Sequence, residues 1–179
     1  MDPEEITEIP LFVEEQRLRQ WWLWLILVPS IGLVWFGFWQ QIILGEKFGN
    51  NPGPDWMWWI LFPVVGVGLP WMLYTLLLRV EVRRDKVLVR FTTPLFPLFR
   101  KTIPMEKILR AEAVTYRPLR DYGGWGIRCG AKGTAYTMSG HHGVRLEMAE
   151  GADMLIGSRQ PHQLAAAIAQ ARADQKPFR

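Results

Sequence analysis

The chain has 179 residues, 49% of them hydrophobic, and a formal net charge of +4. Its single cysteine, Cys129, excludes an intrachain disulfide and a thiolate metal cluster and fits a reducing compartment. The first twenty residues are acidic, which argues against a secretory signal peptide, because such peptides begin with a basic segment.

Two apolar stretches dominate the sequence, 21–44 and 56–78, and neither contains Asp, Glu, Lys or Arg. At about 1.5 Å per residue, each is long enough to cross the roughly 30 Å hydrocarbon core of a bilayer. A buried helix of a soluble protein rarely stays uncharged over such a length. The sequence therefore predicts a transmembrane helical hairpin with a short polar turn at 45–55.

Charge divides the chain into unlike parts. Residues 1–20 carry six acidic and two basic side chains, whereas residues 79–179 carry eighteen basic and nine acidic ones. Lys47 is the one basic residue of the turn between the stretches. The positive-inside rule then places both termini on the cytoplasmic side of the cytoplasmic membrane. We expect an acidic N-terminal tail (1–20), a hairpin (21–78) and a cytoplasmic domain (79–179).

The end of the N-terminal tail has a helix-compatible pattern. From Leu11 the sequence LFVEEQRLRQ predicts a helix that continues into the first membrane helix, while Pro3 and Pro10 keep the preceding residues extended. Leu11 and Phe12 would then lie at the membrane surface as candidate contacts with a protein partner. The alternative is a solvated tail.

Nine of the ten tryptophans lie between residues 21 and 71. Their amphipathic rings prefer headgroup depth, so most should anchor the helices at the two interfaces. The expected anchors are Trp21, Trp22, Trp24, Trp39, Trp56, Trp58, Trp59 and Trp71. Trp35 is instead a candidate contact with a protein partner. Neither stretch contains a histidine or an ionisable group, so no axial ligand and no ion pathway is expected.

Prolines and glycines predict the shape of the hairpin. Pro29, Pro63 and Pro70 should distort the helices locally. When the antiparallel helices are matched from their midpoints, Gly32 lies level with Gly66 and Gly68. Small residues let membrane helices approach closely, so we predict that these three glycines form the hairpin contact.

After residue 78 the pattern alternates between apolar and polar residues, which indicates strands. Two strands should flank a turn at 84–86, where Arg83, Arg84 and Lys86 are candidate partner contacts. Pro94 and Pro97 exclude a central strand over 92–99. Further strands are predicted at 100–103, 109–117, 133–138, 144–149 and 153–157, and a helix from Pro161 to about Arg172. This order suggests a small antiparallel barrel closed by a C-terminal helix.

Several segments resemble those of prokaryotic membrane-anchored proteins with a pleckstrin-homology-like (bacterial PH) domain. They are EEQRLRQWWLW (14–24), IPMEKI (103–108), YGGWGIR (122–128), GVRLEM (143–148) and IGSRQPHQLAAAI (156–168). The resemblance implies a membrane α+β protein in which a two-helix hairpin precedes a PH-like β-barrel. It implies no reaction. Some proteins of similar architecture look like assembly factors of photosynthetic reaction-centre or light-harvesting complexes.

Segments that resemble catalytic or ligand-binding motifs lack the spacing or the residues that those motifs require. The segment GIRCGAKGT (126–134) has the wrong spacing for a phosphate-binding loop. His141 and His142 lack the Cys or acidic neighbours of a metal site. No nucleophile is paired with a base, and no helix-turn-helix or aromatic RNA platform is present. We therefore expect no enzyme activity, no cofactor and no nucleic acid partner.

The predicted strands also give an orientation. The strand that follows the second membrane helix should run away from the membrane, and its partner should return 94–99 to it. We expect Leu95, Phe96, Leu98, Phe99 and Arg79 to contact lipid or a neighbouring membrane subunit.

The sequence thus favours a non-catalytic accessory or scaffold subunit, or an assembly factor, of a larger membrane complex. Its partners would be membrane lipids and other integral membrane subunits. The alternative is a membrane-anchored module that binds anionic lipid or a cytosolic ligand. A basic domain beneath an anionic leaflet gains about 1 kcal/mol for each nearby Lys or Arg.

Overall fold

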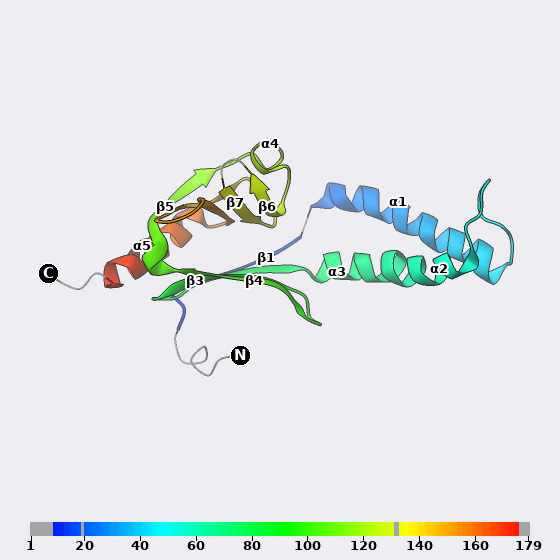
Figure 1. Ribbon diagram of the computed structural model, residues 1–179, viewed down its shortest axis with the longest axis horizontal. Helices are drawn as coiled ribbons and strands as arrows, with labels where there is room; N and C mark the ends of the chain where they lie inside the picture. The colour runs from blue at the N-terminus through cyan, green and yellow to red at the C-terminus, as the bar shows by residue number, and fades with distance from the viewer. Residues whose placement is uncertain (1–8, 19, 131–132, 176–179) are drawn as a thin grey trace. The chain divides into compact units, whose positions relative to one another are not determined.

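The computed structural model describes residues 9–18, 20–130 and 133–175, and it divides the chain into two units (Figure 1). The helical unit spans Leu18–Leu76. The sheet unit combines the residues that precede the helical unit with Leu77–Arg179. The helical unit is therefore inserted into the chain of the sheet unit.

The helical unit contains two long apolar helices. In the first, α1 (Trp21–Phe38) continues into the π-helical turn η2 (Trp39–Ile43). In the second, α2 (Asp55–Leu61) continues through the π-helical segment η3 (Phe62–Gly68) into α3 (Leu69–Thr75). Both helices are long and apolar enough to cross a membrane. The second ends at Thr75, three residues before the expected end of the membrane stretch, because the first strand of the sheet unit begins at Leu77.

The distortion expected at two of the prolines takes the form of η3. Pro63 lies inside this segment and Pro70 lies just beyond it. Each proline lacks the N–H that would donate to a carbonyl four residues earlier, so the α-helical hydrogen-bond ladder is interrupted at both ends of the segment. Leu69 N instead donates to Val64 O, five residues back. Pro29 lies within the continuous helix α1.

The first sheet of the sheet unit is antiparallel and has the order β1-β2-β3-β4. Its strands are β1 (Phe12–Arg17), β2 (Leu77–Val82), β3 (Lys86–Thr92) and β4 (Pro97–Pro104). The helix predicted from Leu11 is wrong, because residues 12–17 pair along the edge of β2. These residues therefore belong to the sheet unit and not to a separate acidic tail. The proline-containing strand β4 lies at the edge, as expected from Pro97.

The second sheet has the order β5-β8-β9-β7-β6, with β7 and β9 parallel. After the turn η4 (Met105–Lys107) the chain forms β5 (Ile108–Thr115), α4 (Pro118–Tyr122), β6 (Gly126–Gly130), β7 (Gly133–Thr137), β8 (His142–Met148), β9 (Met154–Gly157) and α5 (Pro161–Gln175). The predicted strands after residue 100 and the closing helix are confirmed. The sequence analysis missed β6, which lies in the segment compared with a phosphate-binding loop.

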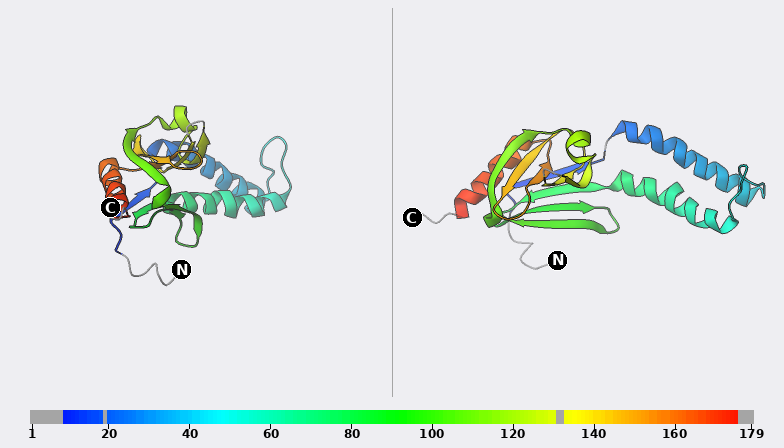
Figure 2. Two further views of the ribbon diagram at one scale, coloured as in Figure 1. Left: turned by 60° about the vertical axis from the view of Figure 1, so that its left-hand side comes forward. Right: turned by 45° about the horizontal axis from the view of Figure 1, so that its top comes forward.

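The expected closed barrel is not formed. The described strands make two sheets whose edges are β1 and β4 in one and β5 and β6 in the other, and no pairing among them joins the sheets. Pro104 has no N–H and η4 turns the chain after it, so β4 and β5 do not continue as one strand. Both views in Figure 2 show the strands as two groups. The fully buried core includes Val80, Val89, Leu146, Ile156 and Leu164.

Candidate functional site

Two buried polar side chains hold β1 in place. Gln16 Nε2 donates to the carbonyl of Gly157 at 2.8 Å. Glu14 accepts hydrogen bonds from Ser158 Oγ at 2.5 Å and from Arg159 N at 2.7 Å. These contacts connect the first strand of one sheet to the segment between β9 and α5. In a strand, residues 14 and 16 project from the same side, so both side chains reach partners in this one segment.

The outer face of the first sheet carries a row of arginines. Arg79 of β2 pairs in register with Arg90 of β3, and Arg90 pairs with Arg100 of β4. Glu15 of β1 lies opposite Arg79. Directly paired residues project from the same side of an antiparallel sheet, so all four side chains share one face. The opposite side carries fully buried residues such as Val80 and Val89.

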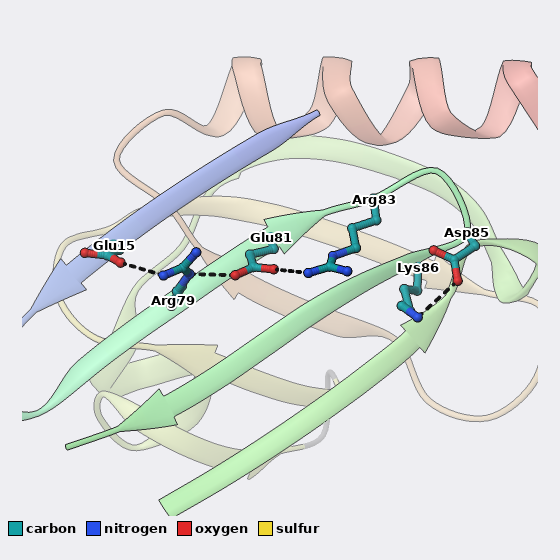
Figure 3. Close-up of polar contacts among 6 residues, drawn as sticks. All are labelled: Glu15, Arg79, Glu81, Arg83, Asp85 and Lys86. Atoms are coloured by element: carbon teal, nitrogen blue, oxygen red, sulfur yellow. Dashed lines mark hydrogen bonds and ion pairs between the residues drawn. The ribbon is translucent and has the colours of Figure 1, made fainter. Parts of the chain in front are cut away.

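A chain of ion pairs crosses this face (Figure 3). Glu81 lies between two arginines, with Oε1 at 2.6 Å from Arg79 Nε and Oε2 at 3.2 Å from Arg83 Nη2. Arg79 Nη1 also lies 3.2 Å from Glu15 Oε1. Like charges in register destabilise a sheet, and these two carboxylates offset that repulsion. We call Glu15, Arg79, Glu81, Arg83, Arg90 and Arg100 the basic face, in which Glu81 and Arg83 are buried.

The remaining partner candidates of the sheet unit lie elsewhere. Arg84 is exposed at the turn between β2 and β3, and Lys86 pairs with Asp85 at 3.3 Å. Phe12 pairs with Val82, and Leu11 N donates to the carbonyl of Val82. Leu11 and Phe12 therefore lie at the end of β1 that is remote from the first apolar helix, roughly 17 Å along a six-residue strand. The continuous helix that was expected to place them at the membrane surface is not formed.

The apolar loop between β3 and β4 is split between exposed and packed side chains. Leu95, Phe96 and Leu98 are exposed. Phe99 instead stacks on Tyr136 with ring centroids 5.7 Å apart and contacts Phe91, so it packs between the sheets. It therefore does not belong to the exposed part of the loop.

In the helical unit, the expected contact between Gly32 and Gly66 is replaced by a hydrogen bond. A Cβ at Gly32 would meet no heavy atom within 4 Å. Gly66 faces Trp35, whose Nε1 donates to the Gly66 carbonyl at 3.0 Å. Because Pro70 has no N–H, that carbonyl lacks its ordinary α-helical donor, and the indole supplies one. A Cβ at Gly68 would lie 3.1 Å from the carbonyl oxygen of Pro63 in its own helix.

This bond predicts the effect of a conservative change. Trp35→Phe should weaken helix pairing by about 1 kcal/mol, because the aromatic ring remains and only the N–H is lost. The measurement is the unfolding free energy of the helical unit in detergent. Trp39→Phe, which alters an exposed ring one turn away, is the control. Equal effects of the two changes would contradict a role for the Trp35 bond.

The turn end of the hairpin has a buried polar cluster. Gln41 Nε2 donates to Gly53 O and to Asp55 Oδ1, both at 2.7 Å, and Trp58 Nε1 donates to Gln41 Oε1 at 2.9 Å. Trp58 is only 6% exposed. It therefore packs within the hairpin, unlike the other expected interface anchors, Trp21, Trp22, Trp24, Trp39, Trp56, Trp59 and Trp71, which are exposed or half-buried.

The part of the chain that the structure describes holds no group of three or more His, Cys, Asp or Glu side chains that could bind a metal ion. A shallow cavity of about 330 Å³ on the second sheet is lined by both basic and acidic side chains, among them Arg110, Glu112, Arg145 and Glu147. Cys129 is exposed, with Sγ 3.8 Å from Thr134 Oγ1. The feature that sequence reasoning missed is the basic face, which only the strand register reveals.

Residues 4–175 match a protein family described as a family of unknown function (DUF6141). No curated protein and no solved structure matches the chain.

Proposed function

Since the chain belongs to this family of unknown function, we propose from its own geometry that it is a membrane-anchored, non-catalytic accessory subunit or assembly factor of a larger membrane complex. Two observations support membrane anchoring: both helices have the length and apolar composition for it, and their outward side chains are largely apolar. In this proposal the hairpin crosses the cytoplasmic membrane, with the sheet unit on the cytoplasmic side. The PH-like relationship and a photosynthetic parent complex stay predictions.

The basic face carries the proposal of a protein partner. Three arginines lie in register across β2, β3 and β4, and the carboxylates Glu15 and Glu81 pair with Arg79 among them. Such a surface is complementary to an acidic segment of another subunit. Complementary charge of this kind fixes the orientation of a partner and excludes wrong partners.

Charge reversal on this face tests the proposal. Arg90→Glu combined with Arg100→Glu should reduce the amount of co-purifying membrane protein by about tenfold or more, because like charges then oppose the acidic partner. The measurement is mild-detergent purification from native membranes, followed by quantitative identification of the bound proteins. Circular dichroism should show that the sheets still form.

A matched control separates this face from general charge effects. Arg110→Glu with Arg145→Glu makes the same change in charge on exposed residues of the second sheet. This control should retain the partner. Equal loss in both variants, or loss in neither, would contradict the assignment to the basic face.

A second function, binding of anionic lipid by the sheet unit, is favoured by a different observation. Leu95 and Phe96 are exposed on the loop that follows β3, and Leu98 is exposed at the start of β4. Exposed apolar groups of this size typically mark a binding surface. The two functions are compatible, because the loop and the basic face involve different side chains.

A further inference from the structure

At one end of the first sheet, the chain connects to both apolar helices. β1 ends at Arg17, before the first apolar helix, and Arg17 pairs with Leu77, the first residue of β2 after the second helix. Leu77 pairs with Thr92, and Thr92 pairs with Pro97. The loop 93–96 therefore lies at the same end as both connections to the helices. We call this the anchor end of the sheet unit.

Contacts between the sheets extend the anchor end to the second sheet. Gln16 is bonded to Gly157, and Phe99 stacks on Tyr136, so both contacts lie near the anchor end of the first sheet. Gly157 pairs with Gly143. At the opposite end, Met105 N donates to the carbonyl of Asp85, and Ala149 N donates to the carbonyl of Lys107. The connection 116–125, which contains α4, therefore also lies at the anchor end.

The connection through α4 and the start of β6 exposes apolar and basic side chains together. Leu119 is 71% exposed and Ile127 is 41% exposed. Arg117, Arg120 and Arg128 are exposed beside them. The acidic residue of this segment, Asp121, accepts a hydrogen bond from the backbone N of Arg117. Leu95 and Phe96, which are 71% and 50% exposed, lie at the same end.

Exposure of Leu119 is a consequence of how the segment packs. Pro118 and Tyr122 fill the buried positions of α4, and Tyr122 contacts Tyr116 with ring centroids 6.2 Å apart. Burial raises the pKa of Tyr116 to about 12, so its hydroxyl stays neutral. Trp125 Nε1 donates to the carbonyl of Gly140 at 3.0 Å.

Glycines complete the turn at the end of α4. Gly123, Gly124 and Gly126 have positive φ angles of 71°, 132° and 102°, which explains the spacing in YGGWGIR. The packed side chains and this backbone together present Leu119 outward from an ordered loop.

We propose that the anchor end docks on an anionic bilayer surface, with Leu95, Phe96, Leu119 and Ile127 at headgroup depth and Arg117, Arg120 and Arg128 on lipid phosphates. The inference rests on the proposed membrane anchoring. β1 ends at Arg17 and α1 begins at Trp21, and Leu76 alone separates α3 from β2, so the anchor end adjoins both helices in sequence. Exposed apolar groups flanked by arginines match the interface of an anionic leaflet.

Site-specific labels test the docking. The full chain with Cys129→Ser carries a fluorescent label on a single cysteine at Leu119 or Leu95, and it is reconstituted into nanodiscs of phosphatidylcholine alone or with one third phosphatidylglycerol. Quenching by a nitroxide lipid and by an aqueous quencher measures whether the label lies in the interface. Labels should be lipid-quenched in anionic discs and water-exposed in neutral ones.

Charge removal provides the decisive comparison. Arg117→Gln, Arg120→Gln and Arg128→Gln together should lower the docked-to-free ratio in anionic discs about tenfold or more, because each arginine near an anionic leaflet adds attraction. Arg84→Gln, Arg110→Gln and Arg145→Gln make the same change in charge away from the anchor end and should leave the ratio unchanged. Equal quenching in the two lipids, or equal loss in the two triple variants, overturns the proposal.

A separate readout identifies failure of the anchoring itself. In sealed vesicles, a label at Asn50, in the turn between the helices, should be accessible to an impermeant reagent only from the side opposite the sheet unit. If the protein is removed from vesicles by alkaline extraction, membrane anchoring is wrong. If it stays inserted while Leu119 remains in water, anchoring holds and docking is wrong.

Discussion

Glu14→Ala should destabilise the sheet unit by about 3 kcal/mol, because it removes two hydrogen bonds to a buried carboxylate. Ser158 Oγ and Arg159 N both donate to Glu14, and Ser158 is itself buried, so the change leaves a buried hydroxyl without this acceptor. The edge strand β1 would lose its attachment to the segment before α5. Chemical denaturation of the full chain in detergent, followed by circular dichroism of the sheets, measures the loss.

The neighbouring carboxylate is the control for this prediction. Glu15→Ala removes only a partly exposed ion pair with Arg79, and exposed pairs contribute about 0–1 kcal/mol. Its effect should therefore be several times smaller than that of Glu14→Ala. If the two variants are equally stable, the contacts of Glu14 do not hold β1, and the packing of β1 against β2 must suffice.

Gly37→Ala should disrupt helix pairing at the turn end of the hairpin by about 2–3 kcal/mol, the upper range for an overpacked core. A Cβ at Gly37 would overlap the six-membered ring of Trp58. The Trp58 ring cannot move aside, because its Nε1 donates a hydrogen bond to Gln41. It also makes an edge-to-face contact with Phe48, with ring centroids 5.6 Å apart. Electron–electron distances between spin labels at Ile43 and Trp56, both exposed, should become longer and more widely distributed.

A second glycine of the same helix shows whether the effect is specific. A Cβ at Gly32 would meet no heavy atom within 4 Å, and alanine is a better helix former than glycine. Gly32→Ala should therefore leave the label distances unchanged. A larger effect at Gly32 than at Gly37 would show that the helices pair along another face.

Local sequence pattern predicts best those helices and strands whose packing partners lie close to them in the sequence. Two uncharged stretches predicted the long helices, and alternating residues after 78 predicted most strands. β1 escaped prediction because EEQR favours a helix locally, and its partner strand β2 comes some sixty residues later. A barrel was expected because strand number alone does not reveal that η4 and Pro104 interrupt the pairing between β4 and β5.

Surfaces are harder to predict than elements, because they depend on register and rotation. Arg79, Arg90 and Arg100 are ten or eleven residues apart, and only the hairpin registers place them in one row. Matching the helices by depth did not predict the rotation that brings Trp35, rather than Gly32, to Gly66. The three glycines of YGGWGIR were a usable signal for an ordered turn near α4, although they do not predict that Leu119 is exposed.

The pairing of β1 with β2 has a consequence for biogenesis. The two strands flank the whole helical unit in sequence, yet Arg17 and Leu77 lie opposite each other in the ladder. If the helices span a membrane, β1 and β2 can pair only after both helices have been synthesised. The start of the first helix and the end of the second must also lie on the same side of the membrane. A chain inserted with a single crossing would keep β2 without its edge partner and Glu14 without Ser158. The first sheet is therefore completed only in chains whose two helices both cross the membrane. Chains with another topology would expose an unpaired strand to quality-control proteases.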